Sequence, residues 1–181
     1  MSRRRTEPFW NIDKILGLTA ILVSLATFGI YLYQTHLIQK QQSAAVWPYI
    51  ECFVNYTPQS EEHSKYQLVI RNKGVGPALV KNISIDYFGI KHSGDPNREY
   101  LEKLFGKENV PDCNFAFANG SVIPAGESVI LLEVIEPEKM ADSFYEIFKA
   151  TTIKICYASI YQDYWITEKD KQPVECESCQ K

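Results

Sequence analysis

The sequence predicts a mainly β protein with two short inserted helices, preceded by one long helix that crosses a membrane and continues as a stalk. Three observations carry this prediction. An uncharged apolar run occupies Ile15 to Tyr33, good helix formers continue to Ala45, and after Pro48 apolar residues alternate with polar ones. Long uncharged apolar runs are typical of membrane helices, whereas a period of two is typical of strands.

The run at 15–33 is long enough to cross a bilayer, because its nineteen residues span roughly 28 Å at about 1.5 Å per residue. A cleaved signal peptide and a buried helix of a soluble protein are the alternatives. A signal-peptide core has only about 7–15 residues and is followed by small residues, whereas this run ends in Tyr31-Leu32-Tyr33-Gln34. We therefore expect a retained anchor, with tyrosines and Trp10 at the two membrane interfaces.

Basic residues flank the two ends of the apolar run unequally. Arg3, Arg4, Arg5 and Lys14 precede it, whereas Lys40 is the one lysine or arginine in the stalk. Cytoplasmic flanks of membrane helices carry the excess of lysine and arginine. We expect the N-terminus in the cytoplasm and the C-terminal domain outside, at a plasma or inner membrane. The opposite orientation, with the C-terminal domain in the cytoplasm, stays open because the asymmetry is small.

Five segments follow from these patterns: a cytoplasmic stub at 1–14, the transmembrane helix at 15–33, a helical stalk at 34–46, a β domain at 47–168 and a polar tail at 169–181. About 135 residues follow the stalk, which suffices for one hydrophobic core. The net charge is −3, and no basic stripe is interleaved with aromatic residues. Nucleic acid is therefore not an expected partner.

Small residues form a stripe on one face of the expected transmembrane helix. They follow spacings of three, four and three, and they are Gly17, Ala20, Ser24 and Thr27. Helix backbones approach closely where side chains are short, so this face is a candidate for packing against another helix. Small residues are common in membrane helices in any case, and the pattern does not distinguish self-association from a partner subunit.

Three segments alternate with the period of a strand: Tyr49–Asn55, Tyr66–Arg71 and Leu79–Phe88. Alternating residues share one face of a strand. The residues expected on one face of each segment are Ile50, Cys52 and Val54, then Tyr66, Leu68 and Ile70, then Leu79, Lys81, Ile83, Ile85 and Tyr87.

The segment between the second and third strands is a candidate structural turn formed by Asn72, Gly74, Gly76 and Pro77. Glycine permits positive φ and the close passage of another backbone, and asparagine can bond to nearby backbone groups. A phosphate-binding loop needs a further glycine and a following helix, whereas a strand is expected here.

The run from Leu68 to Val80, with Asn72-Lys73-Gly74-Val75-Gly76-Pro77-Ala78 at its centre, resembles the strand–turn–strand signature of immunoglobulin-like bacterial modules, including the cell-adhesion-related domains. The chain also resembles single-pass membrane proteins in which a glutamine-rich stalk leads into Trp-Pro-Tyr, here Trp47-Pro48-Tyr49. These likenesses imply an immunoglobulin-like β-sandwich over about half of the outer domain, and they imply no activity. The two inserted helices depart from a plain sandwich.

Two short helices and a closing hairpin complete the expected domain. The first helix should begin at Asp95-Pro96, an N-cap acceptor followed by proline, and end at Gly106. The second should begin at Pro137, and the hairpin should join Thr152–Ile160 to Tyr164–Thr167. The residues expected on the apolar faces of the two helices are Tyr100, Leu101, Leu104 and Phe105, then Met140, Phe144, Ile147 and Phe148.

Two cysteines near the chain end, Cys176 and Cys179, have the spacing of a disulfide, redox or metal-binding pair. A tail disulfide or a tie from the tail to the domain, redox or metal chemistry, and unreactive thiols are the three alternatives. One Cys-x-x-Cys supplies half of a zinc site. Because the chain has five cysteines, one thiol is left over if the others pair.

Catalytic groups do not gather in the sequence. His36, His63 and His92 are far apart, and no nucleophile stands beside a base in a recognised spacing. We expect a protein that is not an enzyme, with no cofactor, no metal and no small-molecule substrate. The expected function is that of a membrane-anchored interaction or scaffolding protein, an accessory subunit of a membrane assembly. The alternative is a thiol-redox or metal-binding module built on Cys176 and Cys179.

Overall fold

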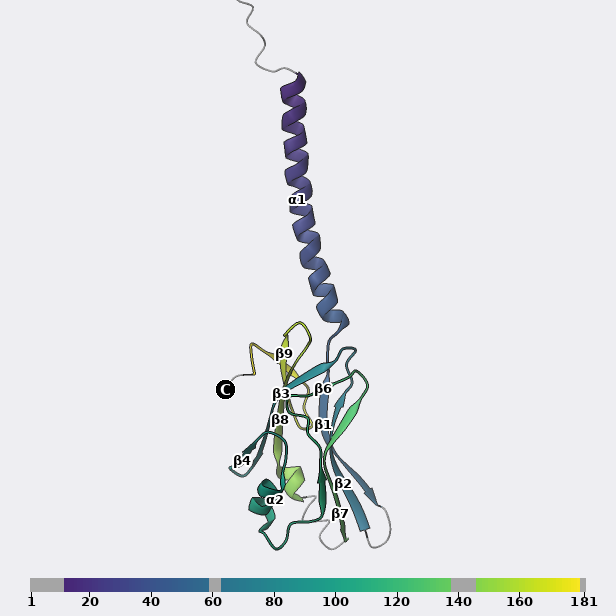
Figure 1. Cartoon of the computed structure of the whole chain (residues 1–181), viewed down its shortest axis with the longest axis vertical. Coiled ribbons are helices and arrows are strands. Elements are labelled where there is room, and N and C mark those ends of the chain that lie inside the picture. Colours follow the sequence, from purple (N-terminus) through teal and green to yellow (C-terminus); the bar gives the residue numbers. More distant parts are fainter. Residues whose placement is uncertain (1–11, 59–62, 138–145, 180–181) are drawn as a thin grey trace, which may run out of the picture. The chain divides into compact units, whose positions relative to one another are not determined.

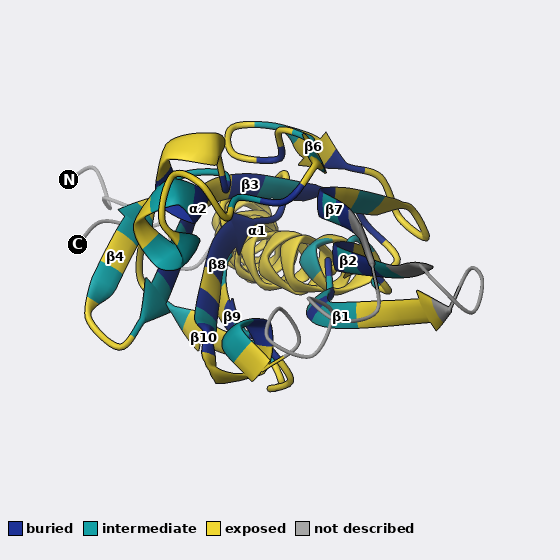
Figure 2. Cartoon of the chain, turned by 90° about the horizontal axis from the view of Figure 1, so that it is seen from below, coloured by how far each residue is buried: buried dark blue, intermediate teal, exposed yellow. Residues whose placement is uncertain are grey.

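The computed structural model describes residues 12–58, 63–137 and 146–179. The chain divides into two compact units, Met1–Gln42 and Ser43–Lys181. The apolar run and the stalk form one continuous helix, α1 (Ile12–Ala45), and the second unit holds all the described strands (Figure 1). The prediction that a long apolar helix precedes a mainly β domain is confirmed. No residue of α1 is buried (Figure 2).

One sheet, which we call sheet A, has four antiparallel strands in the order β1-β2-β7-β5. Their bounds are β1 (Ile50–Pro58), β2 (His63–Asn72), β7 (Ser128–Pro137) and β5 (Cys113–Phe115). The predicted alternation holds in its first two strands, because Ile50 and Cys52 of β1 and Tyr66, Leu68 and Ile70 of β2 are buried. The apolar residues of these strands thus share the inner face of the sheet.

The second sheet, sheet B, has the order β10-β9-β8-β3-β4, and β6 also pairs with β3. The strands are β3 (Ala78–Tyr87), β4 (Ile90–Ser93), β6 (Val122–Ile123), β8 (Thr152–Ala158), β9 (Tyr164–Glu168) and β10 (Val174–Cys176). The predicted closing hairpin is confirmed as β8 and β9. The predicted boundary at 168 is wrong, because residues assigned to a polar tail form β10 and pair with β9 from Val174 opposite Ile166 to Cys176 opposite Tyr164.

A register shift in β3 corrects the predicted inner face of this strand. The pairing of β3 with β8 is irregular between Val80 and Asn82. Ala78 and Val80 are buried before the irregularity, and Ile83 and Ile85 are buried after it. An extra residue in a strand exchanges the faces of the residues on its two sides. The single face predicted from Leu79 to Tyr87 is therefore right only in its second half.

Helix α2 (Arg98–Phe105) is capped by Asn97, whose side chain accepts from the backbone N–H of Tyr100 at 2.9 Å. The predicted cap, Asp95, instead accepts from the backbone N–H groups of Ala118 at 2.9 Å and Asn119 at 3.0 Å. The helix begins later than predicted because the asparagine amide, rather than the earlier carboxylate, reaches its free N–H groups. As predicted, the helix ends at Gly106, which has a φ of 81°.

The second predicted helix is described only at its end, where residues 146–150 are helical. Phe148 is buried as predicted, while Met140 and Phe144 lie outside the described residues. The ammonium group of the buried Lys169 donates to the carbonyl oxygens of Phe148 and, at 2.9 Å, of Lys149. A lysine at a helix C-terminus satisfies carbonyls that have no partner within the helix.

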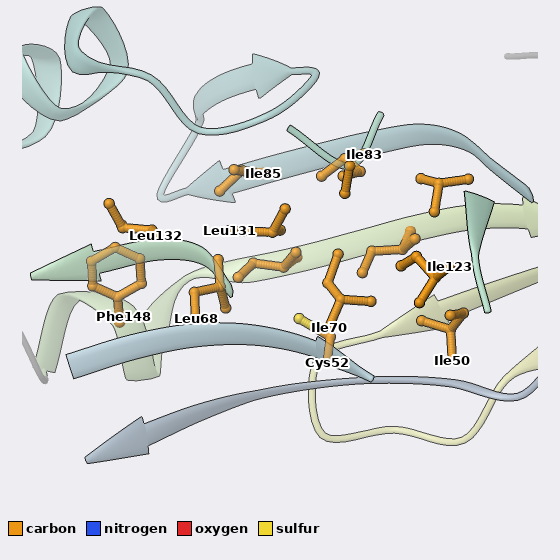
Figure 3. Packing of buried hydrophobic residues seen from close by; sticks show 14 of the residues in the cluster. Ile50, Cys52, Leu68, Ile70, Ile83, Ile85, Ile123, Leu131, Leu132 and Phe148 are labelled. Atoms are coloured by element: carbon orange, nitrogen blue, oxygen red, sulfur yellow. The ribbon is translucent and has the colours of Figure 1, made fainter. Parts of the chain in front are cut away.

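The inner faces of the two sheets enclose one hydrophobic core (Figure 3). Ile50, Leu68 and Leu132 from sheet A meet Ile83 and Ile155 from sheet B, and all five are buried. Polar bonds also cross between the sheets at the edge of β1. The Ile50 N–H donates to the hydroxyl of Tyr157 at 3.2 Å, and the Asp170 N–H donates to the carbonyl oxygen of Cys52 at 3.2 Å. The strand domain therefore forms its hydrophobic core from its own residues.

Candidate functional site

The chain enters the strand domain through Val46–Tyr49, and this segment lies against the turn Asn72–Pro77; we call the two segments together the clasp. The backbone N–H of Lys73 donates to the carbonyl oxygen of Tyr49 at 2.8 Å, and that of Val75 donates to Trp47 at 3.0 Å. The clasp therefore ties the start of β1 to the start of β3, which belong to different sheets.

Asn72 is the polar centre of the clasp and is completely buried. Its side-chain oxygen accepts from the backbone N–H groups of Tyr49 at 3.2 Å and Gly74 at 3.0 Å. Its side-chain nitrogen donates to the carbonyl oxygens of Gly76 at 2.8 Å and Ile123 at 3.0 Å. A buried amide with all of these bonds formed stabilises one backbone arrangement, because each lost bond leaves a buried group without a partner.

The two glycines of the clasp are required for space. Neither Gly74 nor Gly76 has a positive φ, so the expectation of positive φ in this turn is wrong. A β-carbon on Gly74 would overlap the backbone of Trp47 and Tyr49, and one on Gly76 would overlap the backbone of Val46. The expected close passage of another backbone is therefore present. The predicted turn residues, including Pro77, lie together as the sequence suggested, and their role is to hold the entering chain.

The small residues of the transmembrane face lie along one side of α1, and all four are exposed. A β-carbon on Gly17 would meet nothing within 4 Å. The hydroxyl of Thr27 donates to the carbonyl oxygen of Val23 at 2.8 Å, so this polar group is satisfied within the helix. The face formed by Gly17, Ala20, Ser24 and Thr27 is therefore open for close packing.

The candidate pair Cys176 and Cys179 is not bonded to each other in this structure. Cys179 forms a disulfide with Cys156 of β8, and their Cα atoms are 5.6 Å apart. Cys176 is half-buried in β10 and is not disulfide-bonded. The tie from the tail to the domain, one of the alternatives considered from the sequence, describes this bond. Sequence spacing alone favours neighbours, whereas the antiparallel packing of β10 and β9 brings the chain end back over β8.

The outer face of sheet B carries two adjoining hollows of about 610 and 290 Å³, which share Ser84 and Lys154. The charges in them are balanced, since Asp86 lies opposite Lys91 and Lys154 lies opposite Glu168 in the strand register. A hydrogen bond from the Lys171 ammonium lowers the pKa of Glu168. The disulfide closes one end of the smaller hollow, which is lined by Asn82, Ser84, Lys154, Cys156, Ile166, Ser178 and Cys179.

A buried thiol, that of Cys52, lies in the hydrophobic core between the two sheets. Cys52 is 1% exposed, and burial raises the pKa of its thiol to about 12. Burial also lowers the pKa of the nearby Lys169 ammonium. A thiol with so high a pKa is a poor nucleophile at neutral pH. Cys52 therefore serves the core, whereas the other two free cysteines, Cys113 and Cys176, are partly exposed.

The turn between β3 and β4 presents an aromatic side chain that the sequence analysis missed. Phe88 and Gly89 have φ values of 47° and 91°, and Phe88 is 84% exposed. Two-residue hairpins with positive φ at both central positions favour asparagine, aspartate and glycine, because bulky residues are strained there. The Phe88 ring meets that of Tyr87 edge-on at 4.9 Å. The dipeptide Phe-Gly between two alternating segments was the available signal.

Within the described residues, no group of three or more histidine, cysteine or carboxylate side chains is placed to hold a metal ion. The imidazole Nε2 of His92 lies 2.7 Å from the carbonyl oxygen of Asp95, and the ring packs on Tyr100 at 5.1 Å. His92 therefore contributes to the contact between β4 and α2. Three separate features of the described residues are therefore candidates for a role: the clasp, the pair Cys176 and Cys179 near the chain end, and the exposed Phe88 in the turn between β3 and β4.

Comparison with known proteins places the whole architecture in one family. A family model described as "Domain of unknown function (DUF8453)" matches residues 14–175, which is 162 of the 181 residues. No curated protein matches the chain. The match begins within α1 and ends within β10, so it takes in the helix, both sheets and the clasp. The chain belongs to the DUF8453 family.

Proposed function

We propose that this protein is a membrane-anchored interaction subunit, which holds its strand domain outside the cytoplasm as an accessory part of a membrane assembly. The observation that carries the proposal is the environment of α1, a helix of 34 residues in which no residue is buried. So many exposed apolar side chains are costly in water. A bilayer supplies the missing apolar surroundings, and another helix within it supplies a packing partner.

The backbone and side chains of α1 suit a bilayer. Every interior backbone group of an α-helix is satisfied within the segment, which a membrane interior requires. The hydroxyls of Thr19 and Thr27 donate to the carbonyl oxygens of Leu16 at 2.9 Å and Val23 at 2.8 Å, so they add no unsatisfied donor. Length and composition alone make this helix a candidate span.

Two independent features support a domain outside the cytoplasm. Arginines and a lysine precede the apolar run in greater number than basic residues follow it closely. The disulfide between Cys156 and Cys179 is the second feature, because such bonds persist in oxidising compartments and are rare in the cytosol. The basic residues and the disulfide lie toward opposite ends of the chain, and both favour a strand domain outside the cytoplasm.

The path of the chain supports an immunoglobulin-like sandwich. It passes from sheet A to sheet B after β2, after β5 and after β7. Each sheet is antiparallel and contributes one face to a shared core, as in sandwiches. Such domains host many binding functions, so the assignment of an interaction role rests on analogy at the level of the fold. The ring of Phe88 is 84% exposed and is available for a protein contact.

The proposal is tested on the small-residue face of α1. The double variant Ala20→Leu/Ser24→Leu places bulky side chains on that face, and Ala26→Leu/Gly29→Leu makes the same kind of change on the opposite face. Chemical cross-linking of membranes, followed by native electrophoresis, reports the assemblies that contain the chain. We expect the first double variant to lose about tenfold in assembled protein, since close helix contacts are worth about 1–2 kcal/mol.

The control double variant should assemble as the wild type does. Equal assembly of both variants, at equal expression in the membrane fraction, would contradict a packing role for this face. Equal loss in both would indicate damage to membrane insertion rather than to a specific contact.

A further inference from the structure

Two cysteines of sheet B, Cys156 and Cys176, lie on the same outer face. Cys156 of β8 is opposite Ile166 of β9, which in turn is opposite Val174 of β10. Residues directly opposite share a face, and so do residues two apart in one strand. Cys176, two residues beyond Val174, is therefore on the face of Cys156, with β9 between them.

The chain end brings the third cysteine back across β9. A bend at Glu177 follows β10, and Cys179 reaches β8, where it forms the disulfide with Cys156. Cys176 therefore lies three residues before the disulfide-bonded Cys179, with the bend at Glu177 between them.

We propose that Cys176 is an exchange partner for this disulfide, so that the tail alternates between a Cys156–Cys179 bond and a Cys176–Cys179 bond. In the exchange, the Cys176 thiolate attacks the sulfur of Cys179 and forms the new bond. The Cys156–Cys179 bond breaks, and its electron pair leaves with Cys156 as a thiolate. The proton lost by Cys176 is regained at Cys156, and no net oxidation or reduction takes place.

The exchange requires little movement of the fold. Disulfides join residues whose Cα atoms are about 4.4–6.8 Å apart, and two residues separated by three positions come within this distance by tightening one bend. No strand has to leave its sheet, because Glu177 and Ser178 lie beyond the end of β10. Burial raises the pKa of the Cys176 thiol, so its thiolate is scarce at neutral pH and the exchange is slow unless a small thiol assists it.

The exchange would change the outer face of sheet B. Ser178 and Cys179 line the smaller hollow while the tail is bonded to β8. When Cys179 pairs with Cys176, that cover is released and a thiol at Cys156 faces the hollow. The device is independent of the proposed membrane partner, since it involves the tail and β8 alone.

The test uses the full-length protein in detergent micelles at mildly alkaline pH, with graded ratios of reduced and oxidised glutathione. Samples are quenched with acid, alkylated, digested with trypsin and mapped by mass spectrometry. Cleavage after lysine places Cys156 on the peptide 155–169 and both tail cysteines on the peptide 172–181. The two bonds are therefore distinguishable, as two linked peptides or as one looped peptide.

We expect intermediate ratios to give the looped Cys176–Cys179 peptide together with alkylated Cys156. Cys176→Ser should abolish the looped peptide and keep the linked pair, whereas Cys156→Ser should give the looped peptide alone under oxidising conditions. Cys113→Ser, on the other sheet, should behave as the wild type does. The proposal is overturned if the wild type passes from the linked pair to full reduction without looped peptide, or if Cys156→Ser leaves both tail thiols open to alkylation in oxidising buffer.

Discussion

The apolar residues of α1 and those of the strand domain have opposite environments. Many isoleucine, leucine and valine side chains of the domain, such as Ile50, Ile83 and Leu132, are buried in one core. The same residue types in α1, such as Leu22 and Leu25, remain more than half exposed. The domain therefore satisfies its apolar side chains with its own fold, whereas α1 needs surroundings that the chain does not supply. This difference is the physical basis for the proposal that one unit anchors the chain and the other makes contacts.

The largest change in the stability of the strand domain is expected from a substitution in the clasp. Gly76→Val should lower the free energy of unfolding of the domain by about 1–3 kcal/mol, because its side chain would overlap the backbone of Val46. Chemical denaturation of the full chain in detergent, followed by tryptophan fluorescence, measures the change. The helical signal of α1 should persist through that transition, since no residue of α1 is buried.

Val75→Ala is the matched control within the same turn, because the Val75 side chain is 68% exposed. It should leave the midpoint of denaturation unchanged. An unchanged midpoint in Gly76→Val as well would mean that the entering segment moves away at little cost, and the clasp would lose its structural role.

Local patterns predicted the elements well because their causes are local. The uncharged run of α1 and the alternation in β1 and β2 follow from the period of each element. The pattern failed where distant contacts decide. The irregularity after Val80 exchanges the faces of β3, and the choice of Asn97 over Asp95 as cap depends on bonds between Asp95 and residues more than twenty positions away.

The candidate sites show the same division. The turn at Asn72 was predicted because asparagine and glycine act through their own backbone, although positive φ was the wrong reason for its glycines. The partner of Cys179 was not predictable, because cysteine connectivity depends on which strands meet. The sequence did not predict the turn at Phe88, because a phenylalanine with positive φ contradicts the usual residue preference of such turns.

A smaller effect, of opposite sign, is expected at the exposed aromatic tip. Phe88→Asn should raise the free energy of unfolding by up to about 1 kcal/mol, because asparagine tolerates a positive φ better than phenylalanine. Phe117→Asn is the matched control, since Phe117 is 80% exposed without a positive φ. The same denaturation experiment measures both variants. A loss of stability in Phe88→Asn would show that the ring contact with Tyr87 outweighs the backbone strain.

The smallest effect concerns the solvated face of sheet A. A hydrogen bond from Lys65 and a weaker contribution from a hydrogen bond donated by Gln67 lower the pKa of Glu133 below its ordinary value of 4.5. The stabilisation from this carboxylate is therefore present above pH 4.5 and is lost as the pH falls through the folded-state pKa. Glu133→Gln should be less stable than the wild type at neutral pH, with a difference that shrinks on acidification. A difference independent of pH would contradict this role of the charge.

Labelling in intact cells tests the anchored topology most directly. An impermeant maleimide is applied to chains carrying Ser2→Cys or Asp112→Cys, in a background in which Cys113 and Cys176 are serine and the Cys156–Cys179 bond is kept. Buried Cys52 should stay unlabelled. We predict labelling of the probe at 112 in intact cells, and of the probe at 2 only after permeabilisation, with the chain retained in carbonate-washed membranes. Labelling at 2 alone would reverse the orientation, and release of a chain shortened at its N-terminus would show a cleaved signal instead of an anchor.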